Sequence, residues 1–94
     1  MHELSLIVDL MRRVLSIAHE QNALKVTCVK VQLGALSHIS SSHFREHFTN
    51  ASKKTIAEKS ELDIEILTDI NSPDAHSLIL KSVDVETSSG NTNS

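Results

Sequence analysis

Residues 25–33 read KVTCVKVQL, a run rich in β-branched residues. Apolar and polar side chains alternate through its second half, in the order Val29, Lys30, Val31, Gln32 and Leu33. Alternation with a period of two places the apolar side chains on one face of a strand and the polar ones on the other. We therefore expect a β-strand over 25–33, ended by Gly34.

The residues on either side of this strand have helical spacing. Before it, apolar residues recur every three or four positions, at Leu4, Ile7, Val8, Met11, Val14, Leu15 and Ala18. This is the pattern of one apolar helix face, and Asn22 follows it as a suitable left-handed cap. After the strand, the serines at 40–42 are candidate N-caps for a second helix, in which Phe44 and Phe48 share a face.

Two further strands are expected downstream. The segment 60–66, SELDIEI, alternates strictly between apolar and polar residues. The segment 78–85, LILKSVDV, is predicted to place three β-branched residues on one face: Ile79, Val83 and Val85. Turn-forming side chains surround Pro73 between these segments, so we expect the two strands to form an antiparallel hairpin.

The element order helix, strand, helix, strand, strand predicts an α+β fold class. In it, two helices are packed on one face of a three-stranded, mainly antiparallel sheet. Residues 1–86 would form this single domain. The stretch 87–94, TSSGNTNS, has no apolar residue to repay the entropy of ordering it, so we expect a disordered tail.

Composition argues against several classes of function. The 94 residues carry a formal net charge of −3 and are 2% aromatic, which provides no basic field for phosphates and few rings for bases, so nucleic acid is not expected as a partner. No apolar run is long enough for a signal peptide or a membrane span, and we expect a cytoplasmic protein without a membrane partner. With two glycines there is no phosphate-binding loop, and Cys28 has no base indicated beside it, so we do not expect an enzyme.

The first three residues, Met1, His2 and Glu3, offer a set of metal ligands. The Met1 amine, the deprotonated amide and imidazole of His2, and the amide or carboxylate of Glu3 are nitrogen and oxygen donors. Ni²⁺ and Cu²⁺ prefer such donors in a tetragonal arrangement. The same residues have a structural interpretation, because a glutamate in the first turn of a helix interacts favourably with the positive end of the helix dipole. From these residues alone, both interpretations stay open.

The remaining histidines are weaker candidates. His43 and His47 have the i, i+4 spacing with which one helix can bind a metal ion. No glutamate directly follows the first of them, as a zincin motif requires, so a solvated helix surface is the alternative interpretation. His19, His38 and His76 are isolated in the sequence and are expected to be solvated.

Several motifs together resemble a known family. They are Met1-His2-Glu3 with Ser5, VQLGALS (31–37), TIAE (55–58), ELDIE (61–65) and LKSVDVE (80–86). In this order they are similar to motifs of the hydrogenase-maturation nickel metallochaperones of the HypA/HybF type. The resemblance covers nearly all of the chain outside residues 68–77 and the tail.

The resemblance implies a nickel-binding metallochaperone that delivers Ni(II) for maturation of a nickel-iron hydrogenase, and in some organisms of urease. It implies that His2 is the side-chain nickel ligand and that the Met1 amine and the Glu3 amide support it. Its implied partners are the maturation GTPase of the same pathway and the precursor of the hydrogenase large subunit.

One departure from the family pattern is large. Members usually carry a zinc domain with two CxxC pairs between the second and third strands, whereas this chain has residues 67–77 there, without a cysteine. No structural zinc is therefore expected. An alternative function is a metal-independent protein-interaction adaptor in the same maturation pathway. The short connection also raises the prospect of strand exchange between two copies, which would give a homodimer.

Overall fold

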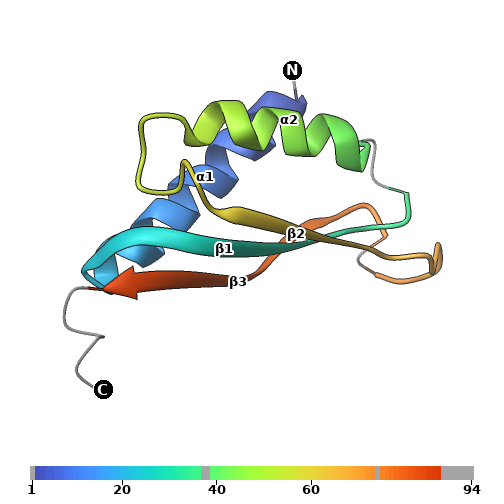
Figure 1. Cartoon of the computed structure of the whole chain (residues 1–94). Helices are drawn as coiled ribbons and strands as arrows, with labels where there is room; N and C mark the ends of the chain where they lie inside the picture. Colours follow the sequence, from blue (N-terminus) through green and yellow to red (C-terminus); the bar gives the residue numbers. More distant parts are fainter. Residues whose placement is uncertain (1, 37–38, 74, 88–94) are drawn as a thin grey trace.

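The computed structural model describes residues 2–36, 39–73 and 75–87, with the side chains of residues 2–4 outside that description. Its elements in chain order are α1 (His2–Glu20), β1 (Ala23–Leu33), α2 (Ser41–Ser52), β2 (Glu61–Ile66) and β3 (Leu78–Thr87). Both helices lie on the same face of the sheet (Figure 1). This arrangement confirms the predicted α+β fold class.

The strand order in the sheet is β2-β1-β3, with β1 parallel to β2 and antiparallel to β3. The predicted hairpin of the second and third strands is therefore wrong, because β1 separates them. Helix α2 connects β1 to β2 as a crossover, and a crossover of this kind makes the two strands parallel. The central position goes to β1 because it buries the most apolar side chains of the three strands: Val26, Val29, Val31 and Leu33.

The connection 67–77 carries the chain across the end of β1 to the other edge of the sheet. At its start, the N–H of Leu67 donates to the carbonyl of Leu33 at 2.8 Å. At its end, the N–H of Gly34 donates to the carbonyl of Ser77, also at 2.8 Å. Both bonds tie the connection to the end of β1, so a short loop closes the sheet within one copy of the chain.

Strand β3 differs from its prediction in the assignment of faces. Its pairing with β1 shifts at Lys81, which has no Cα partner on β1. The extra residue is a β-bulge and reverses the alternation of faces on either side. Val83 and Val85 therefore pack against the core, whereas Ile79 lies at the register position of the polar Gln32. The expectation that these three apolar residues share a face is wrong.

Both helices have the ends that the sequence predicts. Asn22 follows α1 with a φ of 55°, in the left-handed region that asparagine tolerates. At the start of α2, the hydroxyl of Ser40 accepts the N–H of His43 at 3.2 Å, so this serine is the N-cap.

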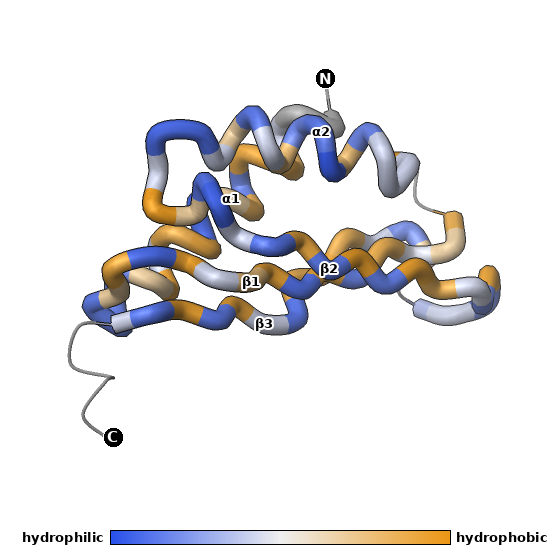
Figure 2. The backbone as a smooth tube through the Cα atoms, viewed as in Figure 1, coloured by the Kyte–Doolittle hydropathy of each residue, from blue (hydrophilic) through white to orange (hydrophobic). Residues whose placement is uncertain are grey.

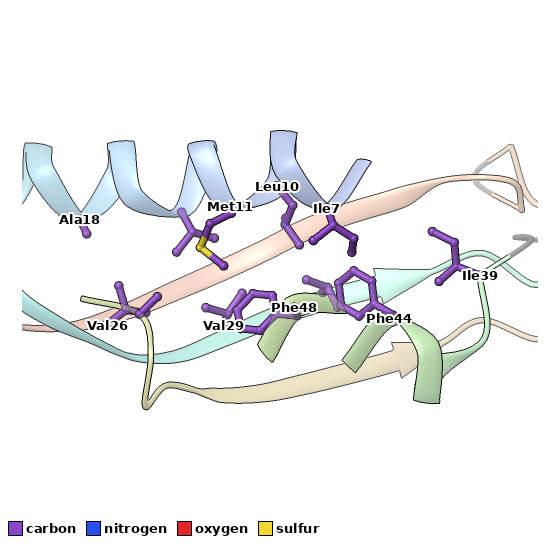
Figure 3. Packing of buried hydrophobic residues seen from close by; sticks show 12 residues of the cluster. Ile7, Leu10, Met11, Ala18, Val26, Val29, Ile39, Phe44 and Phe48 are labelled. Atoms are coloured by element: carbon purple, nitrogen blue, oxygen red, sulfur yellow. The ribbon is translucent and has the colours of Figure 1, made fainter. Parts of the chain in front are cut away.

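The core lies between the helix layer and the sheet, and joins buried apolar residues of both helices and of β1. Figure 2 shows apolar residues interspersed with polar ones along these elements. Phe44 and Phe48 are both buried in α2, with ring centroids 6.3 Å apart. Figure 3 shows Ile7 of α1 close to Phe44, within the cluster that also contains Val29 of β1. Both phenylalanines face the core, which confirms their predicted common face.

The predicted disordered tail and one histidine lie largely outside the described residues. Strand β3 includes Thr87, the first residue of the predicted tail, while 88–94 lie outside the description, as does His38.

Neither helix of the described chain has the length of apolar sequence that crossing a bilayer requires.

Replacing Phe44 by alanine is expected to destabilise the fold by about 3–5 kcal/mol, because it leaves a cavity where α1, α2 and β1 meet. Urea unfolding followed by circular dichroism measures the change. The matched control is Val8→Ala on α1, where the valine is 50% exposed and the expected change stays within about 0.5 kcal/mol. Equal losses in the two variants would contradict this account of the core.

Candidate metal centre

The backbone of two candidate ligands forms the first turn of α1, which begins at His2. The first four N–H groups of an α-helix have no acceptor within the helix. The amides of His2 and Glu3 belong to this set. Deprotonating either amide to bind a metal ion would therefore break no hydrogen bond of the helix ladder.

The candidate side chains at this end lie outside the described part of the structure, and so does Met1. The structure therefore places the backbone of His2 and Glu3 and leaves their side-chain geometry open. The alternative interpretation of Glu3, as a favourable charge at the helix end, needs only that the residue lies in the first turn, which it does.

The first turn is carried by a helix that is firmly anchored a few residues later. Ile7 is 1% exposed and Val14 is fully buried, and both belong to the core cluster. Between the terminus and this anchor, Ser5 is exposed and Leu6 is 43% exposed. Figure 1 shows this end of α1 beside α2, at the outer side of the helix layer. The backbone of His2 and Glu3 thus belongs to a helix whose position is fixed by the core from Ile7 onward.

The two histidines of α2 lie on successive turns of that helix. His43 is exposed and His47 is half-buried, while Glu46 between them is exposed. The other described histidines are solvated, as predicted: His19 in the last turn of α1 and His76 before β3 are both exposed.

Within the residues that the structure describes, no three or more histidine, cysteine, aspartate or glutamate side chains are grouped to hold a metal ion. The described carboxylates therefore do not join His43 and His47 in a site of three ligands, which an enzyme built on this pair would need.

The cysteine is held in its protonated form by its position in the sheet. Cys28 is half-buried in β1, and its register partners are Glu61 on β2 and Asp84 on β3. Burial raises the pKa of the Cys28 thiol, and the negative charges of Asp84, Glu61 and Asp63 raise this pKa further against the opposing effect of Lys30. A thiol with a raised pKa is a poor nucleophile and a poor metal ligand at neutral pH.

Comparison with known proteins identifies the family. The family model described as "Hydrogenase/urease nickel incorporation, metallochaperone, hypA" matches residues 1–71. The chain belongs to the HypA family. The matched residues include all of α1, with the candidate ligands at its start, and both histidines of α2. HypA proteins are metallochaperones and maturation factors rather than enzymes.

Curated relatives match the same part of the chain. The hydrogenase maturation factor HypA of Archaeoglobus fulgidus is 41% identical over 66 residues, which is 70% of this chain and 60% of that protein. The factor of the same name from Aquifex aeolicus is 38% identical over 66 residues, again 70% of this chain and 57% of that protein. The match thus spans less than two thirds of the length of these relatives.

A solved structure shares the fold. The solution structure of the Ni metallochaperone HypA from Helicobacter pylori aligns with a TM-score of 0.76 and 18% identity, covering 90% of this chain and 97% of that one. The likeness agrees with the α+β arrangement described above.

Replacing Asp84 by asparagine is expected to speed the reaction of Cys28 with a disulfide reagent at pH 8. Removal of the Asp84 charge lowers the thiol pKa and so raises the share of thiolate, which is the reacting form. We expect a rate increase of about two- to threefold at low salt, since the carboxylate is exposed and only one of several causes. Absorbance of the released aryl thiolate measures the rate.

The matched control is Asp69→Asn, because Asp69 is exposed in the connection and is not one of the charges that raise the Cys28 pKa. A similar acceleration in both variants would contradict the inference that the charge of the neighbouring Asp84 raises the pKa of the Cys28 thiol.

Proposed function

We propose that this chain is a nickel carrier that binds Ni(II) through Met1, His2 and Glu3. The match of residues 1–71 to a family described as incorporating nickel into hydrogenase and urease is the observation that carries the proposal. The ion is cargo in this proposal, held for delivery.

The donor chemistry of the amino terminus supports this assignment. The Met1 amine, the His2 amide and the His2 imidazole can close small chelate rings around one ion, and the amide or carboxylate of Glu3 adds a further donor. Because the two amides belong to the first turn of α1, their use costs little of the helix. Metal binding by these groups releases protons, so affinity should fall as the pH is lowered.

Delivery requires that the ion can leave, and the position of the proposed ligands supports that step. All of them come from one end of the chain, and the residues that follow, Ser5 and Leu6, are exposed. A recipient protein can therefore approach the ion and replace its ligands one at a time without opening the core.

We propose a nickel-iron hydrogenase large-subunit precursor, or urease, as the recipient, and a maturation GTPase as the partner in transfer. A homodimer is a further arrangement that this proposal admits.

Calorimetric titration with Ni²⁺ tests the proposed ligands. Protein with its native start should bind the ion, whereas His2→Ala and a form extended by two residues before Met1 should each lose at least about tenfold in affinity at this site. The first change removes the imidazole, and the second converts the Met1 amine to an amide and moves the terminal amine two residues away from His2. His19→Ala is the matched control, since His19 is exposed at the other end of the same helix. Unchanged affinity in either ligand variant would refute the site.

The adaptor hypothesis makes a different prediction for the same variant. If docking alone supports maturation, metal-free His2→Ala protein should bind the GTPase or the hydrogenase precursor and restore hydrogenase activity in cells that lack the native protein. If the chain is a nickel carrier, His2→Ala protein should retain its partners but fail to restore activity at low nickel. Hydrogenase activity measured at low and at high nickel separates the two functions.

A further inference from the structure

The two histidines of α2 occupy a position that the proposed site does not use. Their backbone is well fixed, because the Ser40 cap accepts the N–H of His43 and α2 is anchored by its buried phenylalanines. His43 is exposed and His47 is half-buried, so a metal ion could reach the pair from solvent.

A contact on one flank of α2, together with the helix geometry, indicates which way this pair is directed. On one flank, the guanidinium of Arg45 donates to the carbonyl of Leu62 on β2 at 3.1 Å. Successive residues of a helix are about 100° apart, so His47 lies about 160° around α2 from Arg45. The two helices are packed against each other above the sheet, with α2 in contact with β2 and α1 in contact with β3. The flank of α2 away from β2, with His47, is therefore the flank toward α1.

The start of α1 lies near the same part of α2. Ile7 of α1 is close to Phe44, which adjoins His43 in the sequence (Figure 3). His2 precedes Ile7 by five residues, or about 7.5 Å along the helix axis. Helices α1 and α2 are in contact, and Figure 1 shows the start of α1 beside α2.

The chemistry of the pair suits a divalent transition ion. Two histidines at i and i+4 can bind one ion from a single helix face, and imidazole is a good ligand for nickel. Each imidazole has two ring nitrogens, so one nitrogen can keep a partner in the fold while the other binds metal. Two protein ligands leave the remaining positions of the ion to water, which favours weak binding and exchange.

We propose that His43 and His47 form a second nickel-binding site, separate from the amino terminus and next to it. The proposal rests on the proposed function for the identity of the ion. Because α1 and α2 are in contact, the pair can collect nickel for the amino terminus or accept it from there. The two sites would hold the ion differently, with backbone amides at the terminus and with neutral imidazoles and water on α2.

The test separates the two sites by blocking the first. Untagged protein extended by two residues before Met1, which lacks the terminal amine site, is titrated with nickel chloride by calorimetry. We expect this form to retain a weaker binding event, and either His43→Gln or His47→Gln to weaken it at least about tenfold, because one imidazole cannot chelate alone. His19→Gln and His76→Gln, at exposed histidines elsewhere, are the controls and should leave the event unchanged.

A magnetic readout identifies the residues involved. Nickel held by imidazoles and water is six-coordinate and paramagnetic, so it should broaden the amide resonances of α2 around His43 and His47 in the extended form. Circular dichroism confirms that the variants are folded. Because His43 is exposed whereas His47 is half-buried, a loss of nickel binding in His43→Gln is not explained by disturbed packing.

The outcomes distinguish this proposal from the nickel carrier function itself. If the native chain binds nickel and the extended form binds none, the terminal site stands and the second site is refuted. Binding that survives the double substitution of His43 and His47 in the extended form also refutes it. If both forms bind equally and the double substitution abolishes both events, the second site stands and the terminal site is refuted.

Discussion

The fold depends on the burial of one face of strand β1 beneath the two helices and on its pairing with a neighbouring strand along each edge. Strand β1 contributes four buried apolar side chains, and a strand that is apolar on the helix side and paired along both edges belongs at the centre of a small sheet. With two phenylalanines and an aliphatic core, this chain has few other ways to remove enough apolar surface from water. The order β2-β1-β3, the crossover through α2 and the loop across the end of β1 all follow from that placement.

The same packing explains how a candidate metal centre can lie at the end of the chain. Helix α1 is fixed by buried residues from Ile7 onward, while the turn before it has unpaired N–H groups and exposed neighbours. A rigid helix holds the backbone of its first turn at a fixed place, and the exposed Ser5 and Leu6 next to that turn leave it accessible from solvent. The proposed ligands and the buried residues therefore belong to different parts of α1, so substitutions of the proposed ligands are expected to leave the core intact.

The two edge strands of the sheet, β2 and β3, each have a feature that opposes pairing with another strand. On the edge strand β2, the carbonyl of Leu62 accepts a hydrogen bond from the guanidinium of Arg45. On β3, the bulge at Lys81 interrupts the regular edge, and the negative charges of Asp84 and Glu86 follow it. Both devices oppose edge-to-edge pairing in water. The Arg45 contact and the bulge could not be predicted from the sequence, because each depends on which residue the fold brings to the edge.

The sequence by itself determined the local elements: the helical spacing of α1, the alternation in β1 and β2, the Ser40 and Asn22 caps, and the common face of Phe44 and Phe48. These are set by neighbours within a few residues, so periodicity and capping chemistry are enough to predict them. It also supplied the motifs that indicated the HypA family and the ligand candidates at the terminus. Only the tertiary structure decided that β1 separates β2 from β3, that a bulge turns Ile79 away from the core, and that α1 and α2 pack against each other. Strand order, register and helix packing result from competition between distant segments for the same buried surface, and that competition leaves no local pattern in the sequence.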